Sequence, residues 1–312
     1  MSFDPKTCKL VMWGFKNTYH TNSHILEGFY RAAKAIGRES YWLDHKSDLS
    51  GIDFSNSLFI TEHQAVLPGT PVRDDCFYLC HNLYGGSPVA NELLKNANKA
   101  HFGVYTLHYY NDHGRMVLLD NGHMPVYPEK RVMDILWATD LLPHEIEANK
   151  AKAVTWNPDS AVINWIGSGR RTLDPFANAC KQNFVKFNLH SSWDGHIVTV
   201  EDNVRLIQES RFAPTLVDDY QLTHPYIPCR IFKNISYGHF ALSNSGYVKN
   251  FLEANGRACV YHHDAFQLFG EAQRWLQNQS LSELHRAMDW VAAQHTYVNR
   301  TQEVLKAVEL WA

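Results

Sequence analysis

Short apolar runs alternate with amphipathic stretches through the first half of the chain. The runs are nearly continuous in hydrophobic residues, which is typical of strands that a parallel sheet buries on both faces. They cover residues 9–15, 40–44, 57–61, 76–82 and 101–107. Between them, residues 24–37 place apolar side chains on one face of a helix, and further helices are predicted near 87–97 and over 130–148. This alternation predicts a first Rossmann-like domain.

The same alternation starts again near residue 156. The predicted strands are 161–167, 184–189, 211–217, 240–245 and 258–263. The predicted helices are 174–183, 201–210, 228–238, 280–294 and 296–310. The pattern therefore predicts an α/β protein with two Rossmann-like, doubly wound domains that face a cleft, where such folds bind their ligands. We expect the first domain over residues 1–155, the second over 156–295, and a closing helix over 296–312 that crosses back to the first domain.

The composition narrows the class of protein. The chain has 312 residues, a net charge of -3, and hydrophobic and charged fractions of 45% and 20%, as in soluble globular proteins. The near balance of charges argues against a nucleic-acid binder with a broad basic surface. No apolar run is long enough to span a membrane, and the N-terminus lacks the pattern of a secretion signal. We therefore expect a cytoplasmic protein whose six cysteines are buried thiols.

The helix predicted over 228–238 carries polar groups in an otherwise apolar segment. Arg230 and Lys233 are three residues apart and share one face of the helix, and Asn234 and Ser236 follow them. A helix N-terminus favours an anion, and arginine can hold a phosphate with two donors. One interpretation is a surface helix with solvated cations. The apolar neighbours on several sides favour the other interpretation, a phosphate or diphosphate site.

Two further candidates lie at the same edge of the second predicted sheet. The stretch GSGRR starts at Gly167 after a strand and includes Arg170, and glycine at such a turn lets the backbone approach a ligand. Glu209 ends the helix that precedes the strand at 211–217. It either holds a ribose diol or lies exposed at the helix end. The stretch GSGRR gains support from the cations predicted at the same sheet edge, whereas the two interpretations of Glu209 stay equally open.

Histidines and carboxylates follow the strands of the first predicted domain. His24 lies in the first turn of a helix, where the helix dipole favours the neutral imidazole that a general base needs. Glu62 follows the strand at 57–61, and His81 lies at the end of the next strand. Each of them is either a cleft residue or an ordinary cap or loop residue.

Several of these segments resemble a known family. The C-terminal half is similar to the nucleotide-sugar-binding domain of GT-B glycosyltransferases, especially the loosely defined glycosyl transferases group 1, including CgeB-like proteins. Those proteins share an Arg-x-Phe-x₅-Gly helix after a strand with an Ala-Pro turn. The matching segments here are WIGSG, EDNVRLIQESRFAPTLV, YIPCRIFKNISYGHFALSNS and HTYVNR. The N-terminal segments NSHILEGF, FITEHQ and WATDLLP resemble the acceptor-side domain of the same proteins.

The resemblance implies transfer of a sugar from a nucleoside diphosphate sugar, a GDP- or UDP-sugar, to a hydroxyl of a glycan or another acceptor. It implies that Arg230 and Lys233 bind the diphosphate, that Asn234 and Ser236 flank it, and that Gly167 lets the backbone approach the donor. Such enzymes generally need no metal or other cofactor, and no nucleic acid takes part.

The resemblance also bears on the mechanism. Lys233 stands where many retaining members of the family have a glutamate, and an Arg/Lys pair is reminiscent of inverting fucosyltransferases. We therefore expect inversion, with Glu62 or His24 as the general base. An epimerase and a non-catalytic nucleotide-sugar-binding protein remain as alternatives, because both would use the same diphosphate site.

Overall fold

The computed structural model describes residues 3–17, 20, 22–62, 65, 69–81, 101–106, 117–118, 125–167, 171–190 and 198–312. They form two compact units. The first comprises Met1–Leu142 and Tyr297–Ala312, and the second comprises Pro143–Thr296. The helix predicted near 87–97 and the candidate Arg170 lie outside the described residues.

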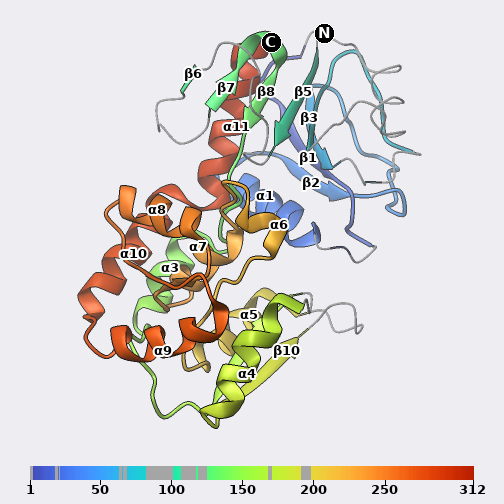
Figure 1. The fold of residues 1–312 in the computed structure, drawn as a ribbon. Helices are drawn as coiled ribbons and strands as arrows, with labels where there is room; N and C mark the ends of the chain where they lie inside the picture. Colours follow the sequence, from blue (N-terminus) through green and yellow to red (C-terminus); the bar gives the residue numbers. More distant parts are fainter. Residues whose placement is uncertain are drawn as a thin grey trace. The chain divides into compact units, whose positions relative to one another are not determined.

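A mixed sheet is the framework of the first unit (Figure 1). Its first six strands run parallel, and the last two continue the sheet with antiparallel pairing. The buried apolar runs confirm the predicted strands of this unit, because both faces of its central strands are covered. In sheet order the strands are β2 (Ser40–Leu43), β1 (Lys9–Trp13), β3 (Ser57–Glu62), β4 (Phe77–His81), β5 (Phe102–Thr106), β8 (Val132–Asp134), β7 (Pro125–Tyr127) and β6 (Val117–Leu118).

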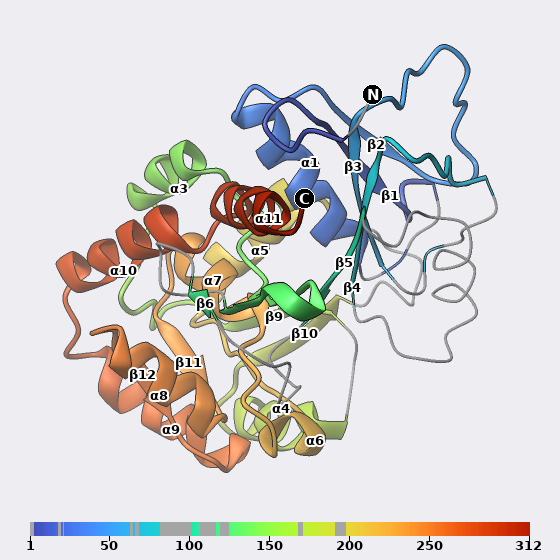
Figure 2. The ribbon, with the colours of Figure 1, turned by 90° about the horizontal axis from the view of Figure 1, so that it is seen from above.

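Two helices, α1 (Ser23–Ala35) and α11 (Tyr297–Trp311), lie side by side on one face of this sheet (Figure 2). They come closest at Gly28, where a Cβ atom would lie 2.3 Å from the Tyr297 ring, so a side chain there would displace the ring. Phe29 packs on the same ring, with centroids 5.0 Å apart. The C-terminal helix therefore packs into the first unit, although it follows the whole second unit in the sequence.

The prediction of a single helix over residues 130–148 is wrong. These residues form β8, an extended segment and the shorter helix α3 (Pro143–Lys150). The segment after β8 is mostly apolar and almost wholly buried, which suits extended backbone as well as a helix. Arg300 of α11 holds it, because its Nε donates to the backbone oxygen of Leu136 at 2.6 Å. Pro143 then suits the first turn of a helix, where its missing N–H costs nothing.

Two short parallel ladders form the sheet structure of the second unit. β9 (Val162–Ile166) pairs with β10 (Lys186–His190), and β11 (Ala241–Ser243) pairs with β12 (Cys259–Tyr261). These four strands confirm the predictions from the sequence. The two strands of each ladder run parallel, and a helix connects them, as is usual in α/β proteins.

Residues 211–217 run between the two ladders and join them. The Arg211 N–H donates to β9 at 2.8 Å, and the Thr215 N–H donates to β11 at 2.7 Å. The strand predicted here is shortened to an isolated bridge between Thr215 and Ser243. Pro214 has no N–H and therefore interrupts the regular hydrogen bonding of a strand.

Eight helices surround these strands in the described part of the second unit. Those expected at 174–183, 201–210, 228–238 and 280–294 are confirmed, whereas α6, α8 and α9 were not predicted. In chain order the helices are α3, α4 (Asp174–Gln182), α5 (Val200–Gln208), α6 (Asp219–Leu222), α7 (Cys229–Ser236), α8 (Gly246–Ala254), α9 (Ala265–Leu276) and α10 (Leu281–Gln294).

The second unit begins earlier than residue 156. Helix α3 packs against α10, and Lys150 of α3 forms an ion pair with Asp289 of α10. His285 of α10 also contacts the backbone oxygen of Lys150 at 3.2 Å. These contacts hold α3 in the second unit, which therefore starts at Pro143.

Candidate functional site

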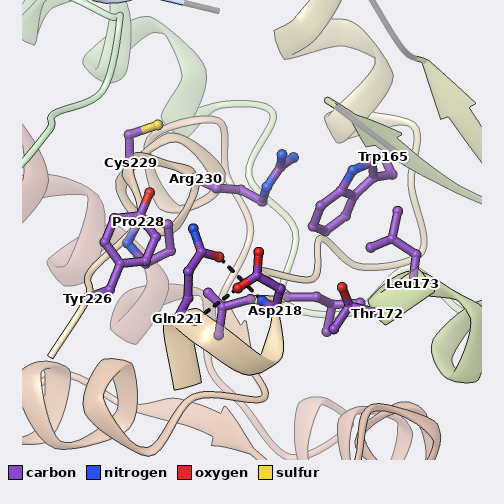
Figure 3. A pocket seen from close by; sticks show the side chains of 11 residues that line it. Trp165, Thr172, Leu173, Asp218, Gln221, Tyr226, Pro228, Cys229 and Arg230 are labelled. Atoms are coloured by element: carbon purple, nitrogen blue, oxygen red, sulfur yellow. Dashed lines mark hydrogen bonds between the residues drawn. The ribbon is translucent and has the colours of Figure 1, made fainter. Parts of the chain in front are cut away.

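A cavity of about 160 Å³ lies in the second unit at the carboxyl end of β9 (Figure 3). The end of the 211–217 segment and the N-terminal ends of α6 and α7 complete its wall. Parallel α/β sheets bind their ligands at this edge. The lining residues are Trp165, Thr172, Leu173, Leu216, Val217, Asp218, Gln221, Tyr226, Pro228, Cys229 and Arg230.

Arg230 supplies the positive charge of this cavity. It is the second residue of α7, and Pro228 is the N-cap of that helix. Ile231, Phe232 and Ile235 are buried and fix another face of α7 in the core, so Arg230 extends into the cavity (Figure 3). Its guanidinium carbon lies 3.7 Å from the centre of the Trp165 ring, which is a cation–π contact.

No described residue forms a hydrogen bond or an ion pair with the Arg230 guanidinium. Burial lowers the pKa of Arg230, which means that its surroundings disfavour the charge. The N–H groups of Cys229 and Arg230, the first two residues of α7, also lack acceptors within the helix. A partly buried cation beside a helix N-terminus favours a bound anion, because both features attract negative charge.

Gly167 lies directly beside this guanidinium. Its φ is +140°, a conformation that residues with a side chain rarely adopt. A Cβ atom at this position would lie 2.7 Å from Nη2 of Arg230 and 3.6 Å from Nε1 of Trp165. The structure therefore brings together Gly167 and Arg230, two residues that the sequence placed at the same sheet edge.

The other three candidates on α7 do not line the cavity. Asn234 is buried, and its Nδ2 donates to the backbone oxygen of Ala213 at 3.0 Å and to Oγ1 of Thr215 at 3.2 Å. Ser236 is also buried, and its Oγ donates to the backbone oxygen of Lys233 at 2.8 Å. Asn234 and Ser236 thus use their polar groups inside the fold. Lys233 is partly exposed in the last turn of α7, away from the helix N-terminus, and its diphosphate role stays a prediction.

Glu209 is the C-cap residue of α5 and is exposed. Its Oε1 accepts a hydrogen bond from Nη1 of Arg205 at 2.9 Å, one helical turn earlier. Glu209 does not line the cavity. Of its two interpretations, the geometry favours the exposed acid at a helix end over the ribose ligand.

Sequence reasoning missed several side chains of the cavity wall. Asp218 and Gln221 form a capping box at the start of α6, with Asp218 Oδ1 accepting from the Gln221 N–H at 2.9 Å (Figure 3). The Asp-x-x-Gln spacing was a usable signal for this helix start. Trp165 and Tyr226 gave no such signal, because an aromatic residue in an apolar segment usually belongs to the core.

The candidate general bases lie in the first unit. Glu62 is the last residue of β3 and is 3% exposed, and its Oε1 lies 3.9 Å from Nδ1 of His81 at the end of β4. Trp137 packs edge-on against His81, with ring centroids 4.7 Å apart. His24 is the second residue of α1 and is only partly buried. The structure thus brings Glu62 and His81 together where two neighbouring parallel strands end.

The described residues show neither a metal-binding cluster nor a helix that could cross a membrane. They hold no group of three or more His, Cys, Asp or Glu side chains that could bind a metal ion. None of the helices described here has both the length and the apolar character that a membrane crossing requires.

Comparison with known proteins gives a family match and likenesses to solved structures. Residues 170–306, which supply most of the cavity wall, match a family described as "Glycosyl transferase-like". A solved structure titled "Crystal Structure of alpha1,3-Fucosyltransferase" aligns over 100% of this chain and 92% of that chain, with 11% identity and a TM-score of 0.43. This second likeness is too distant to carry an argument, and no curated protein matches the chain. Over residues 170–306 the chain is therefore similar to glycosyltransferases.

Proposed function

We propose that the chain is a glycosyltransferase that moves a sugar from a nucleoside diphosphate sugar, a GDP- or UDP-sugar, to an acceptor hydroxyl. The diphosphate binds in the cavity of the second unit, beside Arg230. The family match supports the reaction class, because it covers residues 170–306 and therefore most of this cavity.

The unpaired guanidinium of Arg230 is the observation that carries the proposal. It lines the cavity, stacks on Trp165 at 3.7 Å and pairs with no carboxylate among the described residues. A diphosphate would supply the missing negative charge, and its oxygens match the fork of donors that arginine presents. The adjacent N-terminus of α7 adds free N–H groups and the positive end of its dipole.

The reaction that we propose is a displacement with inversion at the anomeric carbon. The acceptor oxygen forms a bond to that carbon while the bond from the carbon to the β-phosphate oxygen breaks. The electron pair of the broken bond moves onto the phosphate, where Arg230 stabilises the growing negative charge. The proton of the acceptor hydroxyl passes to a general base.

We assign the general base to Glu62. It is a carboxylate at the carboxyl end of a parallel strand, where α/β folds place functional residues, and it is held in a buried cluster with His81 and Trp137. His24 remains the second candidate, because a histidine in the first turn of a helix is favoured in its neutral form.

A thermal-shift panel followed by a turnover assay tests the proposal. GDP, UDP and dTDP are each added in large excess over the protein. A specific ligand at a hundred times its own dissociation constant raises the free energy of unfolding by about 2.7 kcal/mol. The nucleoside diphosphate that stabilises the protein identifies the nucleobase of the sugar donor. Release of that diphosphate from its sugar nucleotide in the presence of an acceptor then identifies a transferase. Stabilisation without release would indicate a binding protein, and no stabilisation by any of the three would refute the proposal.

A further inference from the structure

The indole N–H of Trp165 is a buried donor in the cavity wall. The residue is 5% exposed, and its Nε1 has no hydrogen-bond partner among the described residues. Buried polar groups in folded proteins are nearly always paired, and a buried tryptophan usually finds an acceptor for its N–H. An unpaired indole N–H on a residue that lines a cavity therefore indicates an acceptor that comes from a ligand.

The indole N–H of Trp165 and the guanidinium of Arg230 both lie beside Gly167. The position where a side chain at residue 167 would begin is 2.7 Å from Nη2 of Arg230 and 3.6 Å from Nε1 of Trp165. The two donors thus border the space that Gly167 leaves empty. Neither group can accept a hydrogen bond, so a partner common to both must be an acceptor. Next to a guanidinium, an anionic oxygen is the acceptor that binds most strongly.

We infer that Trp165 is a second ligand of the anion that Arg230 binds, with its indole N–H donating to a phosphate oxygen of the nucleoside diphosphate. This inference rests on the proposed function, because it assigns the diphosphate to the same cavity. Trp165 then acts in two ways. The face of its ring holds the guanidinium of Arg230 in place, and the edge of the ring supplies a neutral donor.

The substitution Trp165→Phe separates these two actions. Phenylalanine keeps an aromatic face for Arg230 but has no N–H, so the variant loses only the proposed hydrogen bond. We expect the dissociation constants for inorganic pyrophosphate and for the nucleoside diphosphate to rise about tenfold, which equals about 1.4 kcal/mol. The dissociation constant for the nucleoside, which has no phosphate, should stay unchanged.

Trp156→Phe is the matched control for this variant. Trp156 lies in the same unit, stacks on Phe212 with centroids 5.9 Å apart, and does not line the cavity. Its replacement should leave pyrophosphate binding at the wild-type level. An equal loss in both variants would overturn the inference, because it would show a general effect of removing an indole.

A spectroscopic measurement tests the hydrogen bond directly in the wild-type chain. The protein has nine tryptophans, and labelling them with ¹⁵N gives one indole N–H signal each. The signal that is missing from Trp165→Phe belongs to Trp165. We expect pyrophosphate to shift that signal downfield, as formation of a hydrogen bond to an anion requires, while the Trp156 signal stays in place.

The outcomes separate this inference from the proposed function. If Arg230→Ala loses pyrophosphate binding while Trp165→Phe binds normally and the Trp165 signal does not move, the inference fails and the proposed function stands. If the wild-type chain binds neither pyrophosphate nor any nucleoside diphosphate, the proposed function fails, and the inference fails with it.

Discussion

Replacing Arg230 with alanine removes the cation of the cavity with little cost to the fold. The side chain makes one described contact of note, its stacking on Trp165, and no described residue forms an ion pair or hydrogen bond with it. A cation–π contact contributes about 0.5–2 kcal/mol, and relief of a poorly solvated charge offsets part of that loss. We therefore expect the free energy of unfolding of the unliganded protein to change by no more than about 1 kcal/mol.

The effect on nucleotide binding should be much larger. A hydrogen bond to a charged group contributes about 1.5–3 kcal/mol, and an arginine at a phosphate usually forms two of them. Allowing for residual binding by the helix N-terminus, we expect a loss of about 2–4 kcal/mol, which raises the dissociation constant of the nucleoside diphosphate about 30- to 700-fold. The dissociation constant of Arg230→Lys should lie between those of the wild-type chain and Arg230→Ala, because lysine keeps the charge but loses the planar fork and the stacking.

Isothermal titration calorimetry with GDP or UDP measures this difference. Arg274→Ala is the matched control, because Arg274 lies on the surface of α9 and pairs with Glu271 at 2.6 Å. That variant should bind the diphosphate as the wild-type chain does. Wild-type affinity in Arg230→Ala would show that diphosphate binding does not depend on this cation.

Three further predictions concern other parts of the chain. Asn234→Ala removes the amide that ties α7 to the neighbouring segment, so the free energy of unfolding in guanidinium chloride should fall by about 1–3 kcal/mol while the diphosphate affinity of the folded protein stays the same. Unchanged stability with a loss of diphosphate affinity would instead indicate that Asn234 binds the sugar nucleotide. Glu62→Gln should slow sugar transfer by about 10²–10⁴ without changing diphosphate affinity, and a loss confined to His24→Gln would move the role of general base to His24. Burial lowers the pKa of His239 to about 4, whereas the unfolded chain binds this proton near the ordinary value of 6.5. Between pH 7 and pH 5 the unfolded state therefore binds more protons than the folded state. The free energy of unfolding falls by about 2 kcal/mol as the pH falls over this range. Urea denaturation should show this loss in the wild-type chain and a loss smaller by that amount in His239→Gln, and an equal loss in both would contradict the assignment.

Much of the fold could be predicted because buried parallel strands leave a clear pattern. β1, β3 and β4 are continuous apolar runs with polar residues at their ends, and the structure confirms each of them. The segment after β8 shows the limit of that pattern. A run that is apolar on all sides fits a strand, an extended segment or a buried helix, and here a long-range bond from Arg300 to Leu136 accompanies the extended form.

The candidate site was predicted in part for a related reason. A cation in an apolar helix is unusual enough to be noticed, and Arg230 does line a cavity at the carboxyl end of a parallel strand. Asn234 could not be judged from sequence, because its acceptors lie on a segment about twenty residues earlier that only the fold brings close. Trp165 was hidden for the opposite reason, since a tryptophan in a strand looks like core until its N–H is found without a partner.

A crystal structure of the protein with its nucleoside diphosphate would show directly whether Arg230 binds the phosphate. We expect a phosphate oxygen within about 3.2 Å of the Arg230 guanidinium, in the cavity that Gly167 and Trp165 border. Density for the diphosphate elsewhere on the chain, with Arg230 still stacked on Trp165 and in contact with no phosphate oxygen, would show that this cavity is not the diphosphate site.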